Sequence, residues 1–190
     1  MKKLLYWLTA KLPCRIISDD GVPYLERYYL GTLFNVRFYI HRFVGSDPAR
    51  GLHDHPWPWA ISLILSGFYY EETRSGLRKV KWINRLTGDS FHRVILSGNY
   101  VREELKDMGY TDALPREKEC WTLFFHYAEY TKPWGFLRKL EAKADVGVVD
   151  TARLWVPHNY PKDGGGSAGE WWRYVPLGHT EPRRMPLGDV

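Results

Sequence analysis

The sequence predicts an all-β fold, built as a barrel or a sandwich of short strands. Aromatic residues make up 16% of the 190 residues, and flat rings pack well on a pleated, half-buried sheet. Apolar and polar residues alternate over several short runs, which is the period of a strand. Glycine, proline and other turn residues separate these runs at short intervals. A chain of this length fits a single domain, so we expect one domain over residues 1–190.

The N-terminus is expected to form a short helix, over residues 1–12, that packs on the domain. Its apolar run resembles a signal peptide, but Lys11 interrupts the run, and Pro13 and Cys14 follow without a small-residue cleavage site. No run approaches the ~18 apolar residues of a membrane span. Cys14 and Cys120 are interpreted as free thiols in a reducing compartment. We therefore expect a cytoplasmic protein without a membrane partner.

Strands are predicted wherever the alternation is bounded by turn residues. Their expected ranges are 24–30, 35–43, 60–66, 68–73, 77–86, 90–96, 120–130 and 134–139. Between the ranges 90–96 and 120–130, residues 97–118 are expected to form a polar insertion with a short helix over 101–108. The barrel core would thus cover about 24–140.

The C-terminal extension, over residues 141–190, is expected to be irregular. A glycine-rich stretch at 162–169 has the composition of a flexible loop. The aromatic segment 171–176 is expected to dock back on the domain, and the last ten residues are expected to be loose.

The charge does not by itself indicate a ligand. There are 27 Lys and Arg residues against 22 Asp and Glu residues, a net charge of +5. The basic residues are scattered, which favours an ordinary solvated surface over a nucleic-acid interface. Nucleic acid is therefore the least favoured partner, although exposed aromatic rings able to stack on bases keep a nucleic-acid-associated protein as an alternative.

The histidines carry the functional argument. His53 and His55 are two residues apart, so on an extended segment both imidazoles point to the same side. His92 shares the core-facing alternation of Val94 and Leu96 on a later strand. Neutral imidazole is the commonest protein ligand of zinc, iron, copper and nickel. Three imidazoles on neighbouring strands could therefore converge on one metal ion.

These residues resemble the two-part motif of the cupin superfamily. The matching positions are Gly51-Leu52-His53-Asp54-His55, Gly67, Gly88 and His92. The segments around them are similar to small uncharacterised cupin proteins of bacteria and phages, over about residues 33–138. The resemblance implies a cupin-like double-stranded β-helix, the jelly-roll barrel. It also implies one divalent metal on His53, His55 and His92, with iron(II) favoured over zinc, nickel or manganese, and a homodimer formed through strand edges.

The sequence departs from the cupin motif at one ligand position. The cupin glutamate would fall at position 59 or 60, where this chain has Trp59 and Ala60. Glu71 or Glu72 could supply an oxygen ligand instead. His126 could be a fourth ligand, a proton carrier behind the ligands, or a structural histidine, and the structural role is favoured. His41 is a similar but weaker candidate.

The leading functional hypothesis is a metal-dependent enzyme, an iron(II) dioxygenase acting on an unknown small molecule. Arg93 and Tyr69, with Tyr70 beside it, are the polar side chains expected to orient the substrate as catalytic residues. Trp57 and Trp59 would help to wall a dry metal pocket. The main alternative is a non-catalytic module whose barrel binds a small, carbohydrate-like ligand, because fold does not determine function.

Overall fold

The computed structural model describes residues 1–109, 116–139, 153–158 and 170–186. Its helices are α1 (Lys2–Thr9), α2 (Ser97–Asp107) and the short 3-10 helix η1 (Trp171–Arg173). Its strands are β1 (Cys14–Asp19), β2 (Val22–Leu33), β3 (Val36–Phe43), β4 (Leu52–His53), β5 (Trp59–Ser66), β6 (Tyr69–Thr73), β7 (Gly76–Val80), β8 (Ile83–Thr87), β9 (His92–Leu96), β10 (Cys120–Tyr127), β11 (Gly135–Lys139) and β12 (Arg153–Pro157).

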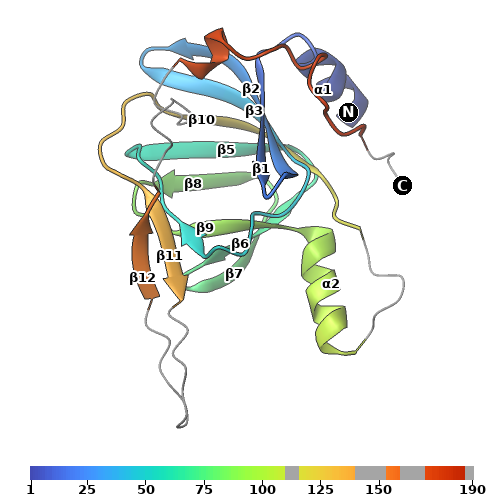
Figure 1. Cartoon of the computed structure of the whole chain (residues 1–190), viewed down its shortest axis with the longest axis vertical. Coiled ribbons are helices and arrows are strands. Elements are labelled where there is room, and N and C mark those ends of the chain that lie inside the picture. Colours follow the sequence, from blue (N-terminus) through green and yellow to red (C-terminus); the bar gives the residue numbers. More distant parts are fainter. Residues whose placement is uncertain (110–115, 140–152, 159–169, 187–190) are drawn as a thin grey trace.

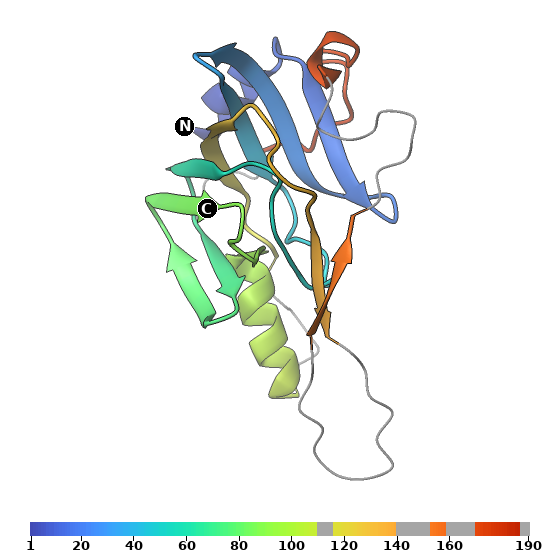
Figure 2. The ribbon, with the colours of Figure 1, turned by 90° about the vertical axis from the view of Figure 1, so that its left-hand side faces the viewer.

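Within the described ranges these strands form two antiparallel sheets of six strands each. The first sheet has the order β1-β2-β3-β10-β5-β8, and the second has the order β12-β11-β4-β9-β6-β7. In Figure 1 the first sheet crosses the upper part of the view, and β6, β7 and β9 of the second sheet lie below it. Figure 2 shows α2 and the β11–β12 pair extending towards the same end of the molecule.

The strand pairing is that of a jelly roll. β3 pairs with β10, β4 with β9, β5 with β8, and β6 with β7. The eight strands thus make one long antiparallel hairpin, whose four successive strand pairs alternate between the two sheets. Such double-sheet winding protects most strand edges by pairing them. The predicted all-β jelly-roll class is confirmed.

Local differences from the predicted elements have physical reasons. The expected strand 77–86 is two strands, because the chain leaves the second sheet at Lys81-Trp82 and enters the first. β1, β4 and β12 were not predicted; β4 has only two residues, too few to show a period. α2 begins at Ser97, four residues earlier than expected.

Apolar side chains fill the space between the sheets in two clusters. The first cluster consists of Leu25, Phe43, Tyr69, Val80, Val94, Leu96 and Cys120. The second consists of Tyr39, Trp57, Ala60, Leu86, Phe124 and Trp171. A third cluster lies on the other face of the first sheet, where Leu5, Tyr6 and Leu12 pack against Trp121 and Tyr28.

The described part of the C-terminal extension is fastened to the barrel. Trp171 is buried and stacks on Tyr39 with 6.1 Å between ring centroids, so the expected docking is confirmed there, whereas Tyr174 is exposed. The expectation of ten loose terminal residues is wrong for 181–186. Arg183 donates to the Tyr6 carbonyl, and the Arg184 amide donates to Glu26. Figure 1 shows this segment, in red, beside α1.

Three further expectations concern the glycine-rich stretch, the two cysteines and a membrane span. The glycine-rich stretch 162–169 lies outside the described residues. Cys14 and Cys120 are both buried and free, as expected. Among the described residues, every helix is too short or too polar to cross a membrane.

Candidate metal centre

Three histidines converge between the sheets, as the sequence predicts. His53 on β4 lies directly opposite His92 on β9, and His55 follows β4 by two residues. The Nε2 atoms of His55 and His92 are 2.8 Å apart. The ligand nitrogens of all three imidazoles lie within 4.8 Å of one another. Among the described residues this is the group that could hold a metal ion.

The histidine segment is kept extended by its neighbours on both sides. β4 pairs with β9 on one side and with β11 on the other, where His53 lies opposite Phe136. Gly51 leads into this segment with a φ of +107°, and an added Cβ there would lie 2.5 Å from the Leu137 carbonyl oxygen. Only glycine tolerates both the conformation and the close approach.

Asp54, between the two histidines, points away from them and anchors the segment. Its Oδ1 accepts a 2.6 Å hydrogen bond from the Gly135 amide, and its Oδ2 accepts one from Lys132 Nζ at 2.9 Å. Because alternate residues of an extended chain face opposite sides, this anchoring turns His53 and His55 towards the interior. Asp54 is therefore a support for the histidines.

Glu71, on β6, holds His92 from behind. Its Oε1 lies 2.7 Å from His92 Nδ1, which leaves Nε2 of that ring directed at the other histidines. Glu71 is fully buried and also accepts hydrogen bonds from Asn84 Nδ2 and, at 2.6 Å, from Arg78 Nε. Carboxylates in this position fix the ring orientation and tautomer of a metal-binding histidine and raise its basicity.

The electrostatics favour neutral imidazoles beside an ionised carboxylate. Burial lowers the pKa of His53 and of His55 well below its usual value, and neighbouring charged groups lower both further. Burial would raise the pKa of Glu71, but hydrogen bonds from His92 and Asn84 and the charge of Arg78 outweigh it and lower the pKa. Neutral imidazole is the form that binds metals. The site is thus prepared for a cation.

The donor set fits a divalent transition metal. Three imidazole nitrogens suit iron, zinc, copper or nickel, whereas magnesium and calcium prefer oxygen ligands. His53, His55 and His92 would hold the ion, and Glu71 would orient His92. Trp134 and Phe136 flank His53 with ring centroids 6.4 and 6.1 Å away, and Trp57 stacks on His55 at 3.9 Å. These rings reduce the access of water to the site.

Among known proteins, the chain is similar to solved structures only. No protein-family model and no curated protein matches it. Solved structures do match. One is a cupin-2 domain protein from Rhodospirillum rubrum, with 15% identity, a TM-score of 0.45, and coverage of 70% of this chain and 78% of that one.

Two further solved structures are similar to the chain at comparably low identity. A cupin-like protein from Thermotoga maritima has 16% identity and a TM-score of 0.43, over 65% of this chain and 84% of that one. A cupin 2 conserved barrel domain protein from Rhodopseudomonas palustris has 9% identity and a TM-score of 0.44, over 66% and 77%. The chain is similar to cupins. At this level of identity the similarity concerns the fold and does not extend to a reaction.

The three other candidate ligands, Glu71, Glu72 and His126, lie outside the group of three histidines. Glu71 lies behind His92, and Glu72 points to the other face of the sheet, where its Oε2 accepts a 3.0 Å hydrogen bond from Arg93 Nε. Neither belongs to the metal-binding group. His126 is buried between Trp57 and Tyr39, with 5.1 and 5.6 Å between ring centroids. Its Nδ1 lies 2.6 Å from the Tyr127 carbonyl oxygen, which fits a structural role.

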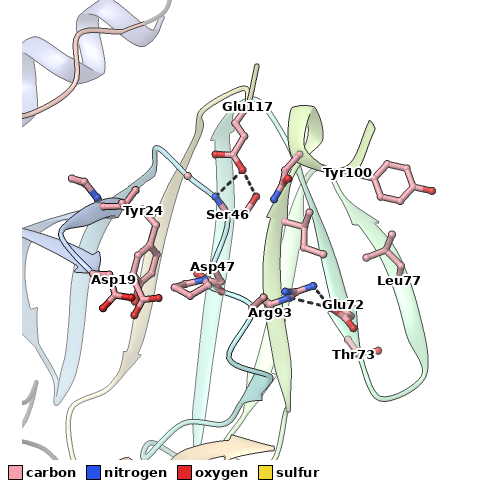
Figure 3. A pocket seen from close by; sticks show the side chains of 18 of the residues that line it. Asp19, Tyr24, Ser46, Asp47, Glu72, Thr73, Leu77, Arg93, Tyr100 and Glu117 are labelled. Atoms are coloured by element: carbon pink, nitrogen blue, oxygen red, sulfur yellow. Dashed lines mark hydrogen bonds and ion pairs between the residues drawn. The ribbon is translucent and has the colours of Figure 1, made fainter. Parts of the chain in front are cut away.

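Arg93 and Tyr69, the expected catalytic residues, lie away from the three ligand nitrogens. Arg93 follows His92 on β9 and therefore faces outwards, into a cleft of about 1050 Å³ that Figure 3 shows. None of the three histidines lines this cleft. Tyr69 is buried, and its hydroxyl accepts a 3.1 Å hydrogen bond from Asn84, which itself bonds Glu71. Their catalytic assignment stays a prediction.

Sequence reasoning missed the supporting residues of the site. Asn84 and Arg78 were placed within a single strand, and the bond from Glu71 to His92 was not foreseen. One signal was available, because Glu71 shares the inward alternation of Tyr69 on β6. A carboxylate on a core-facing position needs a partner, and His92 on the neighbouring strand is the nearest candidate.

Proposed function

We propose that this chain is a metal-dependent enzyme that binds one transition-metal ion on His53, His55 and His92 and acts on a small molecule. The observation that carries the proposal is the convergence of three partly or fully buried imidazoles, with ligand nitrogens within 4.8 Å of one another. Buried polar groups normally have their hydrogen bonds satisfied within the fold. Three imidazoles aimed at one another are better satisfied by a cation than by each other.

The ligand set favours iron(II) and an oxygenase reaction, specifically that of a dioxygenase. Iron(II) on these three imidazoles would keep a positive charge and could activate dioxygen beside a bound substrate. The protein's own part is to orient and to exclude water. Glu71 holds His92 in one orientation, and Trp57, Trp134 and Phe136 present apolar surfaces around the other two histidines.

Metal analysis of matched variants tests the proposal. We expect the full chain, loaded with iron(II) under anaerobic conditions, to bind one equivalent of metal. His53→Ala and His92→Ala should each lose most of it, because two imidazoles hold an ion far less tightly than three. His179→Ala is the matched control, because His179 is exposed and bonds only the Ala10 carbonyl among the described residues. Stoichiometric metal in all variants would overturn the assignment.

Dioxygen consumption then separates an enzyme from a binding module. With iron(II) bound, we expect uptake of dioxygen to depend on an added small organic substrate and to be lost in His92→Ala. A chain that binds metal or ligand without any such turnover supports the alternative of a non-catalytic cupin-like module. Retention on single-stranded DNA at low salt would instead support the nucleic-acid alternative.

A further inference from the structure

Three polar residues form a row across the inner face of the first sheet. Arg27 on β2 lies directly opposite His41 on β3, and His41 lies directly opposite Thr122 on β10. Residues paired in this way on adjacent strands have neighbouring side chains on the same face. The row Arg27-His41-Thr122 is thus one continuous polar strip, and the metal centre does not use it.

The row lies at the same level of the barrel as the metal centre. On each of its three strands the row separates the first apolar cluster from the second. Arg27 lies between Leu25 and Tyr29 on β2. His41 lies between Phe43 and Tyr39 on β3, and Thr122 lies between Cys120 and Phe124 on β10. The metal centre occupies the same interval on the second sheet. His92 precedes Val94 of the first cluster by two residues, and His55 stacks on Trp57 of the second.

Arg27 is a cation that has no acidic partner among the described residues. Its side chain is partly buried, and within the described residues its guanidinium makes a single hydrogen bond, from Nε to His41 Nε2 at 3.1 Å. None of the ion pairs found in the described part of the chain involves Arg27, whose guanidinium carbon lies 5.6 Å from the Tyr39 ring centroid. Charges withdrawn from water are normally paired, and among the described residues no group bonds the Nη1 and Nη2 donors of this partly buried guanidinium, so they are available to an anion.

The other two members of the row favour the same ligand. His41 accepts the bond from Arg27 and is buried, and burial together with the charge of Arg27 keeps its pKa well below the usual value. A neutral His41 therefore fixes the guanidinium without adding charge. Thr122 is fully buried, and its Oγ1 has no hydrogen-bond partner among the described residues. A buried hydroxyl without a partner is costly, and a ligand oxygen would satisfy it.

We propose that the row Arg27-His41-Thr122 binds the carboxylate of a small organic anion whose body reaches across the barrel towards the metal centre. The guanidinium fork matches a carboxylate in two parallel hydrogen bonds. One cation balances one negative charge, which favours a monoanionic carboxylate over a phosphate dianion. Tyr39 and Phe124 are the neighbouring inward-facing residues on β3 and β10, so the surroundings of the row are aromatic and suit an apolar or flat ligand body.

The anion site itself stands on the residues of the first sheet, and only the reaction of the bound anion rests on the proposed function. His41 stacks on Phe124 with 4.6 Å between ring centroids. Phe124 lies 5.7 Å from Trp57, which stacks on His55 at 3.9 Å, so a line of neighbouring rings joins the row to the metal centre. An anion held by Arg27 would therefore also be attracted to a metal dication on His55. This deepens the proposed function by naming its substrate class as small carboxylates.

Calorimetric titration with benzoate tests the anion site. Benzoate carries a carboxylate on a flat ring, and benzamide has the same shape without the charge. We expect the full metal-free chain to bind benzoate and to bind benzamide at least about tenfold more weakly, since hydrogen bonds to a charged group contribute about 1.5–3 kcal/mol. Inorganic phosphate is the third probe, and tighter Arg27-dependent binding of phosphate would overturn the carboxylate assignment.

Variants identify the residue responsible. Arg27→Gln should weaken benzoate binding about 10- to 100-fold, and Arg27→Lys, which keeps the charge but loses the fork, should lie between the two. Arg85→Gln is the matched control, because Arg85 is exposed on β8 and its loss changes the net charge equally. The comparison of benzoate with benzamide on the unaltered chain gives a result even where a variant fails to fold.

Metal content keeps this test distinct from that of the proposed function. Arg27→Gln is expected to bind as much iron(II) as the unaltered chain, because Arg27 is not one of its ligands. If metal does not bind but benzoate binding depends on Arg27, the proposed function fails and the anion site stands. If benzoate does not bind, or binds equally to the unaltered chain, to Arg27→Gln and to Arg85→Gln, the anion site is overturned.

Discussion

Two buried charged networks lie on opposite faces of the first sheet and differ in the groups on which they end. The inner network joins Glu71, His92, Asn84 and Arg78 between the sheets. The outer network joins Arg42, Glu26 and Glu119 beneath α1 and the C-terminal segment. Each is built around a fully buried carboxylate. Both networks must therefore offset the free-energy cost of burying a negative charge.

The outer network sets one guanidinium between two carboxylates, and of these Glu119 keeps one oxygen, Oε1, without a hydrogen-bond partner among the described residues. Arg42 pairs with both Glu26 and Glu119, and Glu26 also accepts hydrogen bonds from the Tyr28 hydroxyl and the Arg184 amide. The inner network satisfies Glu71 in the same manner but ends on His92, whose Nε2 faces two further imidazoles. A network that ends on a guanidinium shared by its carboxylates is structural, and one that ends on converging lone pairs is prepared for a ligand.

The largest expected effect concerns the outer network. Arg42→Met should lower the free energy of unfolding by about 3–5 kcal/mol, because it leaves two buried carboxylates without a counter-charge. Arg93→Met, which breaks the more exposed pair with Glu72, should cost no more than about 1 kcal/mol. Urea denaturation measures both, and the metal content of folded protein should be unchanged in each. A loss of metal in folded Arg42→Met would show that the two networks are coupled.

A smaller effect is expected from the inner network. Glu71→Gln removes the charge behind His92 and should weaken zinc binding about 10- to 100-fold, as is usual for a carboxylate that supports a ligand. Glu72→Gln is the matched control on the adjacent, outward-facing position. Competition titration against a coloured chelator measures both affinities. Equal affinities in the two variants would mean that Glu71 only stabilises the fold.

The smallest effect tests a buried histidine outside both networks. Burial lowers the pKa of His126 to about 3, whereas an unfolded chain has a histidine pKa near 6.5. Stability is therefore retained above pH 6.5 and lost as the pH falls towards 3, because the unfolded chain takes up a proton that the folded chain refuses.

His126→Phe should remove that loss. Between pH 7.5 and 5.5 the unaltered chain should lose about 1 kcal/mol more of its free energy of unfolding than the variant does. Urea titrations at the two pH values, with a chelator present to keep the metal centre empty in both proteins, measure the difference. An identical pH dependence would mean that His126 takes up a proton as readily in the folded chain as in the unfolded chain.

The parts of the fold that sequence could predict are those with a local period. The alternation in β3, β5, β6 and β10 identified strands within one or two residues at most ends. The two-residue strand β4 has no period, and the break at Lys81-Trp82 depends on the chain changing sheets. Such a crossing is set by tertiary packing, which a local pattern does not encode.

The candidate site likewise has residues that a local pattern predicts and contacts that depend on strand pairing. His53 and His55 were predicted from their spacing, and His92 from its place among core-facing residues. The bond from Glu71 to His92 spans 21 residues, and the register that places Arg27 opposite His41 spans 14. Those contacts depend on which strands pair and in which register, and that information is not local. Arg27 left one trace in the sequence, a charge at a core-facing position between Leu25 and Tyr29.

The central claim is that three imidazoles hold one metal ion, and X-ray absorption of the zinc-loaded chain tests it most directly. Zinc avoids oxidation and reports its ligands by distance, with nitrogen of imidazole at about 2.0–2.1 Å and sulfur at about 2.3 Å. We expect a first shell of nitrogen and oxygen with the scattering of three imidazole rings, reduced to two rings in His92→Ala. A shell containing sulfur, or one that is identical in His92→Ala, would contradict the claim.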